Sequence, residues 1–139
     1  MATMHELFDH TADLGLRITA PDLNALFAEA GECLFSAVVE DVASIRPTTA
    51  ATIGLTGDDR EFLLFDWLRE LLMQFEMEHM LYGRFDVQVR PDGLTATAWG
   101  EPLDRGRHHL SHEVKAITYH ELKVVETDGG WLAEVIVDI

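Results

Sequence analysis

Two stretches of the chain carry apolar residues at a spacing of three to four, the pattern of a helix with one face in a core. The first follows Pro21 and continues to about residue 39, with Asp22 placed to cap its start. The second covers about 59–79, and the acidic turn Gly57–Asp59 puts negative charge where a helix dipole favours it. The second helix has the wider apolar face, so we expect it to be the more buried. Its apolar residues are Phe62, Phe65, Leu68, Leu71, Leu72 and Phe75.

The other segments alternate apolar and polar residues over short runs, as strands do when one face is buried. Pro91-Asp92-Gly93 and Asp128-Gly129-Gly130 are turn sequences that each join two runs as a hairpin. The predicted strands are 5–10, 14–18, 52–55, 85–89, 94–98, 116–126 and 131–139. Helices and strands do not alternate strictly. The sequence therefore predicts one α+β domain over residues 1–139, a two-layer sandwich with two helices packed on a mostly antiparallel (mixed) β-sheet.

Charge limits the partners that such a chain can have. Of the 139 residues 47% are hydrophobic, which is enough for one core, and 10 Lys and Arg stand against 25 Asp and Glu, a net charge of −15. Binding to DNA or RNA without sequence preference needs cations that neutralise phosphate, so an acidic surface disfavours it, and it disfavours an anionic membrane for the same reason. An acidic protein suits metal cations or a basic protein partner.

Cys33 is the only cysteine, which excludes an intramolecular disulfide and a cysteine-based zinc site. No secretory signal and no apolar run of about 20 residues is present, so we expect a protein of the reducing cytoplasm. There is no glycine-rich phosphate loop and no GxSxG nucleophile motif, and Cys33 lies beside the apolar stripe of the first helix. The motifs alone do not predict a self-contained enzyme.

The carboxyl terminus combines a strongly strand-forming run with a carboxylate. Asp138 follows Val135-Ile136-Val137, and the chain stops one residue later at Ile139. We expect a paired interior strand whose end holds the Asp138 side chain close to the Ile139 terminal carboxylate. Two carboxylates that close repel unless a proton or a cation lies between them, and Ca²⁺ and Mg²⁺ prefer oxygen clusters of this kind. The alternative is an exposed terminal residue without a role.

Two further segments carry residues suited to chemistry. His10-Thr11-Ala12-Asp13 follows the first predicted strand, and Ser111–His120 precedes or overlaps the strand predicted at 116–126. The alternative for Asp13 is a turn residue, because Asp close to Gly15 is a common turn signal. The alternative for His120 is a packed, hydrogen-bonded strand histidine.

The segment 105–112 is rich in histidine and arginine. His108, His109 and His112 have zinc-ligand side chains, but a loop without cysteine does not fix their geometry. Arg105 and Arg107 add positive charge, which makes the segment a candidate contact for a phosphate or an acidic patch. A mobile, solvated loop is the alternative, and the sequence does not choose between them.

Taken together, these motifs resemble the archease family. The resemblance is carried by Phe8–Gly15, by the helix from Leu23 to Val39, by Glu113–His120 and by the closing Val135–Ile139. It covers essentially the whole chain in order and length. The combination of His-Thr-Ala-Asp, Lys-Ala-x-Thr-Tyr-His and a terminal Asp-Ile is specific, whereas each motif alone would be weak.

The resemblance implies a small α+β accessory protein, not an enzyme, that assists RtcB-type RNA ligases. Those ligases use GTP and a divalent metal to join RNA ends in tRNA splicing or RNA repair. Archease-like proteins promote guanylylation of the ligase histidine and allow multiple turnover. RNA would be contacted only through the ligase. An older family description, a chaperone or modulator of proteins that include a tRNA methyltransferase, is the alternative.

The resemblance also assigns site residues. It places a divalent metal on Asp13 and Asp138, and we add the Ile139 carboxylate on the charge argument above. Lys115 matches a functional lysine, expected to contact the ligase or its phosphates; in the same motif, His120 is expected to orient this network and Tyr119 is its neighbour. Oxygen ligands favour Ca²⁺ or Mg²⁺, while nearby His10 leaves room for Mn²⁺ or Zn²⁺.

Two functions of other classes remain. A general chaperone would expose a large apolar patch. A metal-dependent hydrolase would use the same carboxylates to activate water, but the missing nucleophile and phosphate loop count against it. The segment Arg105–Ser111 matches no firm family pattern, and the sequence does not decide whether the protein delivers a metal or remodels its partner.

Overall fold

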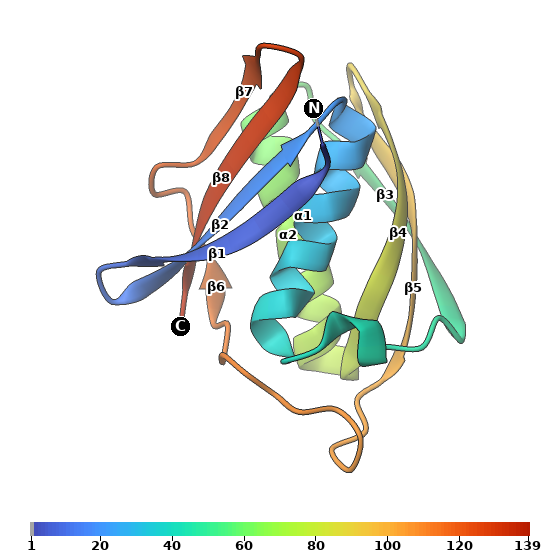
Figure 1. Cartoon of the computed structure of the whole chain (residues 1–139). Helices are drawn as coiled ribbons and strands as arrows, with labels where there is room; N and C mark the ends of the chain where they lie inside the picture. The colour runs from blue at the N-terminus through green and yellow to red at the C-terminus, as the bar shows by residue number, and fades with distance from the viewer. Residues whose placement is uncertain (1) are drawn as a thin grey trace.

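The computed structural model describes residues 2–139, and it places two helices between two antiparallel sheets (Figure 1). Helix α1 spans Leu23–Val38 and helix α2 spans Arg60–Glu78. The five-stranded sheet has the order β1-β2-β8-β6, with β7 also on β8, and the three-stranded sheet has the order β3-β5-β4. The strands are β1 Met4–His10, β2 Asp13–Ala20, β3 Thr49–Thr56, β4 Met80–Arg90, β5 Gly93–Pro102, β6 Ala116–Ile117, β7 Lys123–Thr127 and β8 Gly130–Asp138, and a 3-10 turn covers Val42–Ser44.

The α+β class with two helices against antiparallel strands is confirmed. The predicted two-layer arrangement is corrected in one respect. The strands form two sheets, with the helices between them, so the molecule has three layers instead of two (Figure 1). Every strand pair of the described residues is antiparallel, so the mixed pairing that we allowed for is not seen there. The physical reason is that helix α1 has buried residues on more than one side, and a single sheet covers only one side of a helix.

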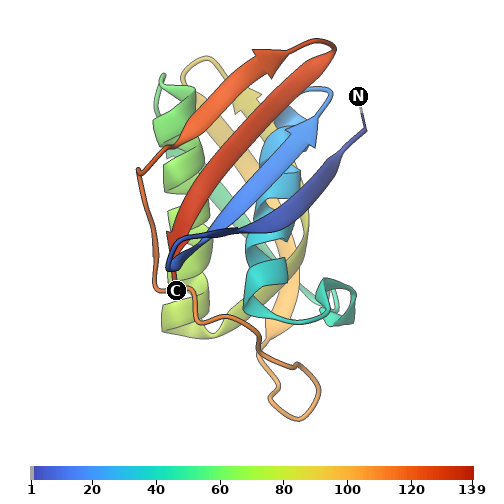
Figure 2. The ribbon, with the colours of Figure 1, turned by 60° about the vertical axis from the view of Figure 1, so that its left-hand side comes forward.

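The prediction that the second helix is the more buried is wrong. Nine of the 16 residues of α1 are buried, against seven of the 19 residues of α2. Helix α1 packs on β2 in one sheet and on β4 in the other, whereas α2 lies at the side of the molecule (Figure 2). The ring of Phe62, at the start of α2, is 55% exposed although the sequence placed it on the core face.

A hydrogen bond inside the core joins the two helices. Trp67 of α2 is fully buried, and its indole Nε1 donates to the carbonyl oxygen of Phe27 in α1 at 2.9 Å. A buried indole N–H needs such an acceptor, because an unpaired polar group in a core is costly. The surrounding buried side chains form one hydrophobic cluster to which both helices and both sheets contribute.

The local signals for helix starts and turns are confirmed. The Asp22 side chain accepts from the Ala25 N–H at 2.8 Å, and Asp59 accepts from the N–H groups of residues 61 and 62. Gly93 turns the hairpin β4–β5 with a φ of 157°, and a Cβ there would lie 2.2 Å from the Leu55 carbonyl oxygen. Only glycine avoids that contact.

The predicted strand 116–126 is wrong in its centre. It divides into β6 and β7, and both pair with β8. Ile117 pairs with Val137 and Lys123 with Glu134, so five residues of one strand face two residues of the other. The excess residues bulge out as a turn, and the left-handed backbone of Glu121 (φ 54°) is part of it. His120 therefore lies in a turn and not at a strand position.

Two side chains, Arg107 and His108, anchor the segment 103–112 to the fold, while most of its other residues are exposed as in a solvated loop. His108 is 2% exposed; its Nδ1 accepts from the Asp104 N–H at 2.9 Å and its Nε2 lies 2.9 Å from a Glu101 carboxylate oxygen. Arg107 pairs with Glu101 and donates to the Ser44 carbonyl oxygen at 2.8 Å. Both ring nitrogens of His108 are engaged, and within residues 2–139 the three histidines of this segment do not gather as a metal site.

Glu101 is the acceptor on which this anchoring depends. The hydrogen bond from Arg107 lowers the pKa of Glu101 to about 2; burial acts in the opposite direction, while the Arg46 N–H and His108 add to the lowering. Arg105 and Arg107, the two candidate phosphate contacts, therefore differ: Arg107 is engaged in the ion pair with Glu101, whereas Arg105 is exposed.

Neither helix of residues 2–139 has a stretch apolar and long enough for a membrane span.

Replacing Glu101 by Gln tests the anchor. The variant leaves Arg107 without its anion, so we expect its free energy of unfolding at pH 7 to fall by about 1–3 kcal/mol. Because the pKa of Glu101 is lower in the folded state than its ordinary 4.5, the stabilisation is present above pH 4.5 and is lost as the pH falls toward about 2. Denaturant unfolding at several pH values measures the difference.

Glu126→Gln is the matched control, since Glu126 is exposed on β7 and forms no ion pair among the described residues. A stability gap between wild type and Glu101→Gln that stays constant from pH 7 to about pH 2.5 would contradict the assignment.

Candidate functional site

The ends of four strands meet at one end of the five-stranded sheet, close to the carboxyl terminus (Figure 2). The last pair of the β2–β8 ladder is Leu14 with Val137, so the next residue along each strand is Asp13 and Asp138. His10 pairs with Asp13 on one side, and Ala116 pairs with Asp138 on the other. The residues that the sequence singled out at positions 13 and 138, which are 125 residues apart, are therefore cross-strand neighbours.

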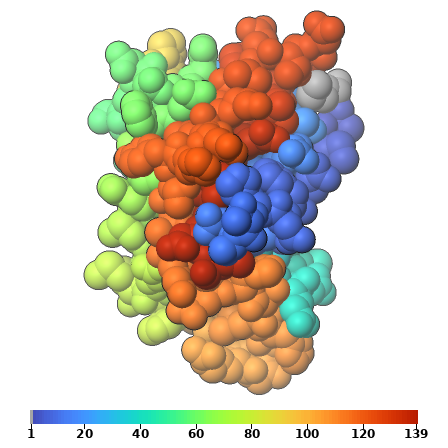
Figure 3. Space-filling view, turned by 90° about the vertical axis from the view of Figure 1, so that its left-hand side faces the viewer, coloured from blue at the N-terminus to red at the C-terminus, as the bar shows by residue number. Residues whose placement is uncertain are grey.

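The alternation of each strand decides which way these carboxylates point. Leu14 and Leu16 of β2 and Val135 and Val137 of β8 are buried against the helices. Successive side chains of a strand point to opposite faces, so Asp13 and Asp138 lie on the outer face of the sheet. Figure 3 shows the carboxyl-terminal residues (dark red) at the surface beside the β1–β2 hairpin (blue). The expectation of a paired interior strand that ends in a carboxylate is confirmed.

Gly15, which could have marked Asp13 as a turn residue, has another role. It lies inside β2, and the ring of Phe8 covers it so closely that a Cβ would be 2.2 Å from a ring carbon. The guanidinium of Arg17 stacks on the Phe8 ring, 4.3 Å from the ring centre. The Phe8–Gly15 contact holds β1 on β2 and so fixes the hairpin that carries Asp13.

On the outer face of the five-stranded sheet, charged side chains form ion pairs in the middle, and Asp13 and Asp138 at the end are not part of those pairs. In the middle, Arg17 pairs with Glu6 at 2.7 Å and with Glu134 at 2.5 Å, and Lys123 lies 3.4 Å from Glu134. At the end, neither Asp13 nor Asp138 has an ion-pair partner anywhere in residues 2–139. Two unpaired carboxylates on neighbouring strands are an oxygen donor set that fits a hard divalent cation.

Lys115 lies next to this pair through the backbone. Its N–H donates to the Asp138 carbonyl oxygen at 2.7 Å, just before β6 begins. The residue is exposed, and its ammonium has no ion-pair partner among the described residues. The structure thus brings Asp13, Asp138 and the Lys115 backbone to one place and leaves the Lys115 side chain free to reach outward.

A second group of side chains gathers beside the hairpin end. The Nε2 of His10 lies 3.1 Å from a carboxylate oxygen of Glu121, the Nε2 of His120 lies 3.7 Å from the other oxygen, and the two imidazole ring centres are 5.4 Å apart. Sequence reasoning named both histidines but missed Glu121. The only signal for it was its place directly after His120, because the turn that aims it at His10 is set by the register of β8.

Tyr119 has a packing role on this side of the molecule. Its ring stacks on Phe65 of α2 with 3.9 Å between ring centres, and it meets Phe62 edge-on at 5.5 Å. Tyr119 and Phe62 are still more than half exposed. The contact ties the turn 118–122 to α2, and the exposed faces of the two rings form a small apolar surface next to the histidines.

Sequence and fold comparisons agree on the family. The model of the Archease protein family (MTH1598/TM1083) matches residues 5–139. The protein archease of Methanopyrus kandleri is 38% identical over 138 residues, with 96% of this chain and 98% of the relative covered, and that of Sulfurisphaera tokodaii is 35% identical with 96% and 97% covered. The chain belongs to the archease family.

Solved archease-family structures have the same fold. The solution structure of protein 1598 of Methanobacterium thermoautotrophicum superposes with a TM-score of 0.85 at 36% identity, over 97% of this chain and 98% of that one. A crystal structure from Thermotoga maritima, described as an archease and possible chaperone, superposes with a TM-score of 0.64 at 19% identity over the full length of both chains, which supports the fold alone.

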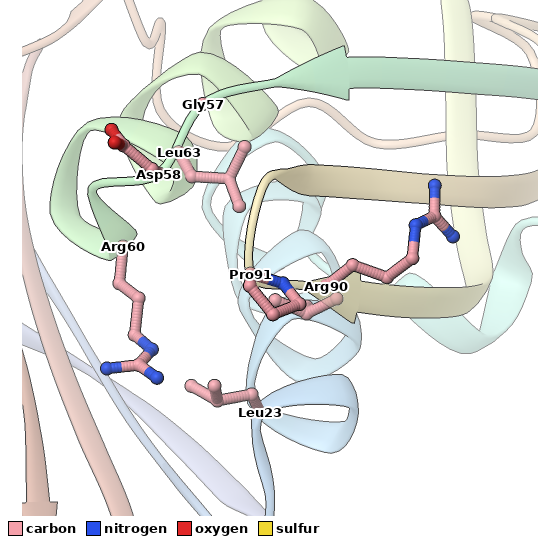
Figure 4. Close-up of a pocket in the computed structure, with 8 residues that line it drawn as sticks. Leu23, Gly57, Asp58, Arg60, Leu63, Arg90 and Pro91 are labelled. Atoms are coloured by element: carbon pink, nitrogen blue, oxygen red, sulfur yellow. The ribbon is translucent and has the colours of Figure 1, made fainter.

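The cavities of this archease-family chain lie away from the paired carboxylates. A cavity of about 340 Å³ lies at the far end of β2, where the starts of both helices meet the β4–β5 turn (Figure 4). A cavity of about 440 Å³ lies between the end of α2 and the segment 103–113. Asp13, Lys115 and Asp138 line neither cavity. The carboxylate pair is therefore a surface feature that another molecule can approach directly.

Replacing Asp138 by Asn tests the like-charge pair. Directly opposed like charges destabilise a strand pair, so in chelator the variant should be as stable as wild type or more stable by up to about 1 kcal/mol. With millimolar Ca²⁺ the order should reverse, because wild type alone gains the binding free energy. Denaturant unfolding with and without Ca²⁺ measures both differences.

Asp86→Asn is the matched control, since Asp86 is exposed on β4 in the other sheet and has no ion-pair partner among the described residues. A large loss of stability for Asp138→Asn under both conditions would show that Asp138 serves the fold and not a cation.

Proposed function

We propose that this archease-family chain is an accessory protein that activates an RtcB-type RNA ligase. It would promote guanylylation of the ligase and multiple turnover in tRNA splicing or RNA repair, through a bound divalent cation and direct protein contact. One observation carries the proposal: Asp13, Asp138 and the Lys115 segment, far apart in sequence, meet at one exposed end of the sheet.

The proposed site holds a cation by its oxygen atoms. Asp13 and Asp138 supply two carboxylates, and the Ile139 carboxylate is the proposed third donor. Such a set suits Ca²⁺ or Mg²⁺, and a cation there supplies positive charge to a phosphate of the nucleotide-loaded partner. Lys115 is proposed to contact the ligase or the same phosphates, since its side chain is exposed beside the carboxylates.

The charge of the chain supports a protein partner over RNA. A net charge of −15 repels a nucleic-acid backbone, so RNA would be contacted only through the ligase. The two cavities described above, which could enclose a small substrate, are lined by none of Asp13, Lys115 and Asp138. Both features support an activator and not an enzyme, and we propose the cytoplasm as the place of action.

A general chaperone is the second candidate. The exposed rings of Phe62 and Tyr119 and the exposed Met77 of α2 provide apolar surface of the kind that binds unfolded chains. Suppression of aggregation of unrelated proteins, unchanged in Asp13→Ala and Asp138→Ala, would support this second function over the first.

A guanylylation assay of a cognate RtcB-type ligase, with and without this protein, tests the first proposal. We expect the wild-type protein to raise the rate and to permit multiple turnover. Asp13→Ala, Asp138→Ala and Lys115→Ala should lose most of that stimulation while their circular dichroism spectra and unfolding midpoints stay close to wild type.

Asp86→Ala and Lys123→Ala are the matched controls, since they remove a carboxylate and the other lysine of the chain away from this end. No effect of the wild-type protein on the ligase would overturn the proposal. Full stimulation by both aspartate variants would overturn the role of the carboxylates.

A further inference from the structure

We infer that His10, His120 and Glu121 form a second metal site, one for a nitrogen-preferring transition metal such as Zn²⁺. The three side chains come from the end of β1 and from the turn between β6 and β7. One ligand atom from each lies within 4.8 Å of the other two, and within residues 2–139 this is the one group of three or more such side chains placed so closely. None of the three belongs to the Asp13–Asp138 pair.

The distances between the ligand atoms are close to those around a bound zinc ion. Bonds of about 2.0–2.2 Å from zinc to nitrogen and oxygen place neighbouring donor atoms about 3.3–3.6 Å apart. The measured separations lie on either side of this range, with 3.1 Å from His10 Nε2 to Glu121 and 3.7 Å from His120 Nε2 to Glu121. The two distances end on different oxygens of the Glu121 carboxylate, which lies between the two imidazoles.

The two segments that carry the ligands are held in place. His10 ends β1, where it pairs with Asp13, and its side chain is only 24% exposed. The turn is fixed to β8 by the Thr118 hydroxyl, which donates to the Ile136 carbonyl oxygen at 2.8 Å, and to α2 by the stacking of Tyr119. Glu121 adopts its left-handed backbone within this fixed turn. A preorganised ligand set lowers the entropy cost of binding.

The ring of His10 directs its Nε2 toward Glu121, 3.1 Å from a carboxylate oxygen. Its Nδ1 is buried and has no hydrogen-bond partner among the described residues. Because the Glu121 carboxylate only accepts hydrogen bonds, Nε2 carries the ring proton in the metal-free protein, and a cation that binds at Nε2 moves this proton to Nδ1, which no other hydrogen bond occupies within residues 2–139. Two imidazoles with one carboxylate is a donor set that suits zinc and related metals, and not Ca²⁺ or Mg²⁺, which need an all-oxygen shell.

The exposure of the ligand side chains predicts a metal site that is open to solvent. His120 and Glu121 are each 63% exposed, so a metal held by the three side chains keeps at least one position toward solvent. Three protein ligands with one open position is the arrangement that allows zinc to bind water or an external ligand. The inference does not depend on the proposed function, because no ligand of the Asp13–Asp138 pair is used.

Titration of the untagged full-length protein with Zn²⁺, followed by calorimetry, tests the site. Wild type should bind Zn²⁺, and the same site loaded with Co²⁺ should show the visible absorption of a low-coordinate nitrogen-ligated ion. His10→Ala, His120→Ala and Glu121→Gln should each weaken Zn²⁺ binding by at least roughly 10-fold, which is the minimum effect of losing even an outer partner of a ligand. Asp86→Asn, which removes an exposed carboxylate from β4 in the other sheet, should retain it.

His109→Ala is the matched control, since His109 is an exposed histidine outside the group. Zn²⁺ affinity that is unchanged in His10→Ala and His120→Ala, or no Zn²⁺ binding by wild type at millimolar concentration, would overturn the inference. Ligase stimulation and Ca²⁺-dependent stability are measured separately, so failure of this site and failure of the proposed function give different results.

Discussion

The pairing of β2 with β8 is the constraint on which the rest of the molecule depends. Strand β8 is bonded to β2 along one edge and to β6 and β7 along the other, and its inward residues Val135 and Val137 are fully buried. A slip of one residue would turn these valines to solvent and Asp138 into the core, which the hydrophobic effect does not allow. The register that buries the core is therefore the same register that sets Asp13 beside Asp138.

The same strand creates the second cluster of the site. Because β6 and β7 pair with β8 on the same edge, the chain between them must bulge, and that bulge carries His120 and Glu121 to His10. The pairing of β8 with its neighbouring strands thus places two groups of possible metal ligands close together: the Asp13–Asp138 pair and the His10–His120–Glu121 group. The oxygen pair suits a hard cation and the histidine group suits a softer one, so the two can be told apart by their metal preference.

A few of the charged side chains are engaged within the fold. Arg17 and Lys123 are engaged by carboxylates on the outer face of the five-stranded sheet, and Arg107 is engaged by the buried Glu101. Lys115 and the two end aspartates are left outside these pairs. On the outer face of the five-stranded sheet, the end that carries Asp13, Asp138 and Lys115 is therefore a place where two carboxylates and one lysine have no ion-pair partner among the described residues.

The sequence by itself determined both helices with their caps, the hairpin at Gly93 and the terminal interior strand, because periodicity and turn residues act over short distances. Its motifs also singled out Asp13, Lys115, His120 and Asp138 as candidate site residues, whose roles stay predictions. Only the tertiary structure decided that the strands form two sheets with α1 buried between them, that Phe62 faces solvent, that His108 is buried on Glu101, and that Glu121 meets His10. These features depend on pairings between residues far apart in the chain, and local periodicity carries no information about which distant strand or charge a residue will meet.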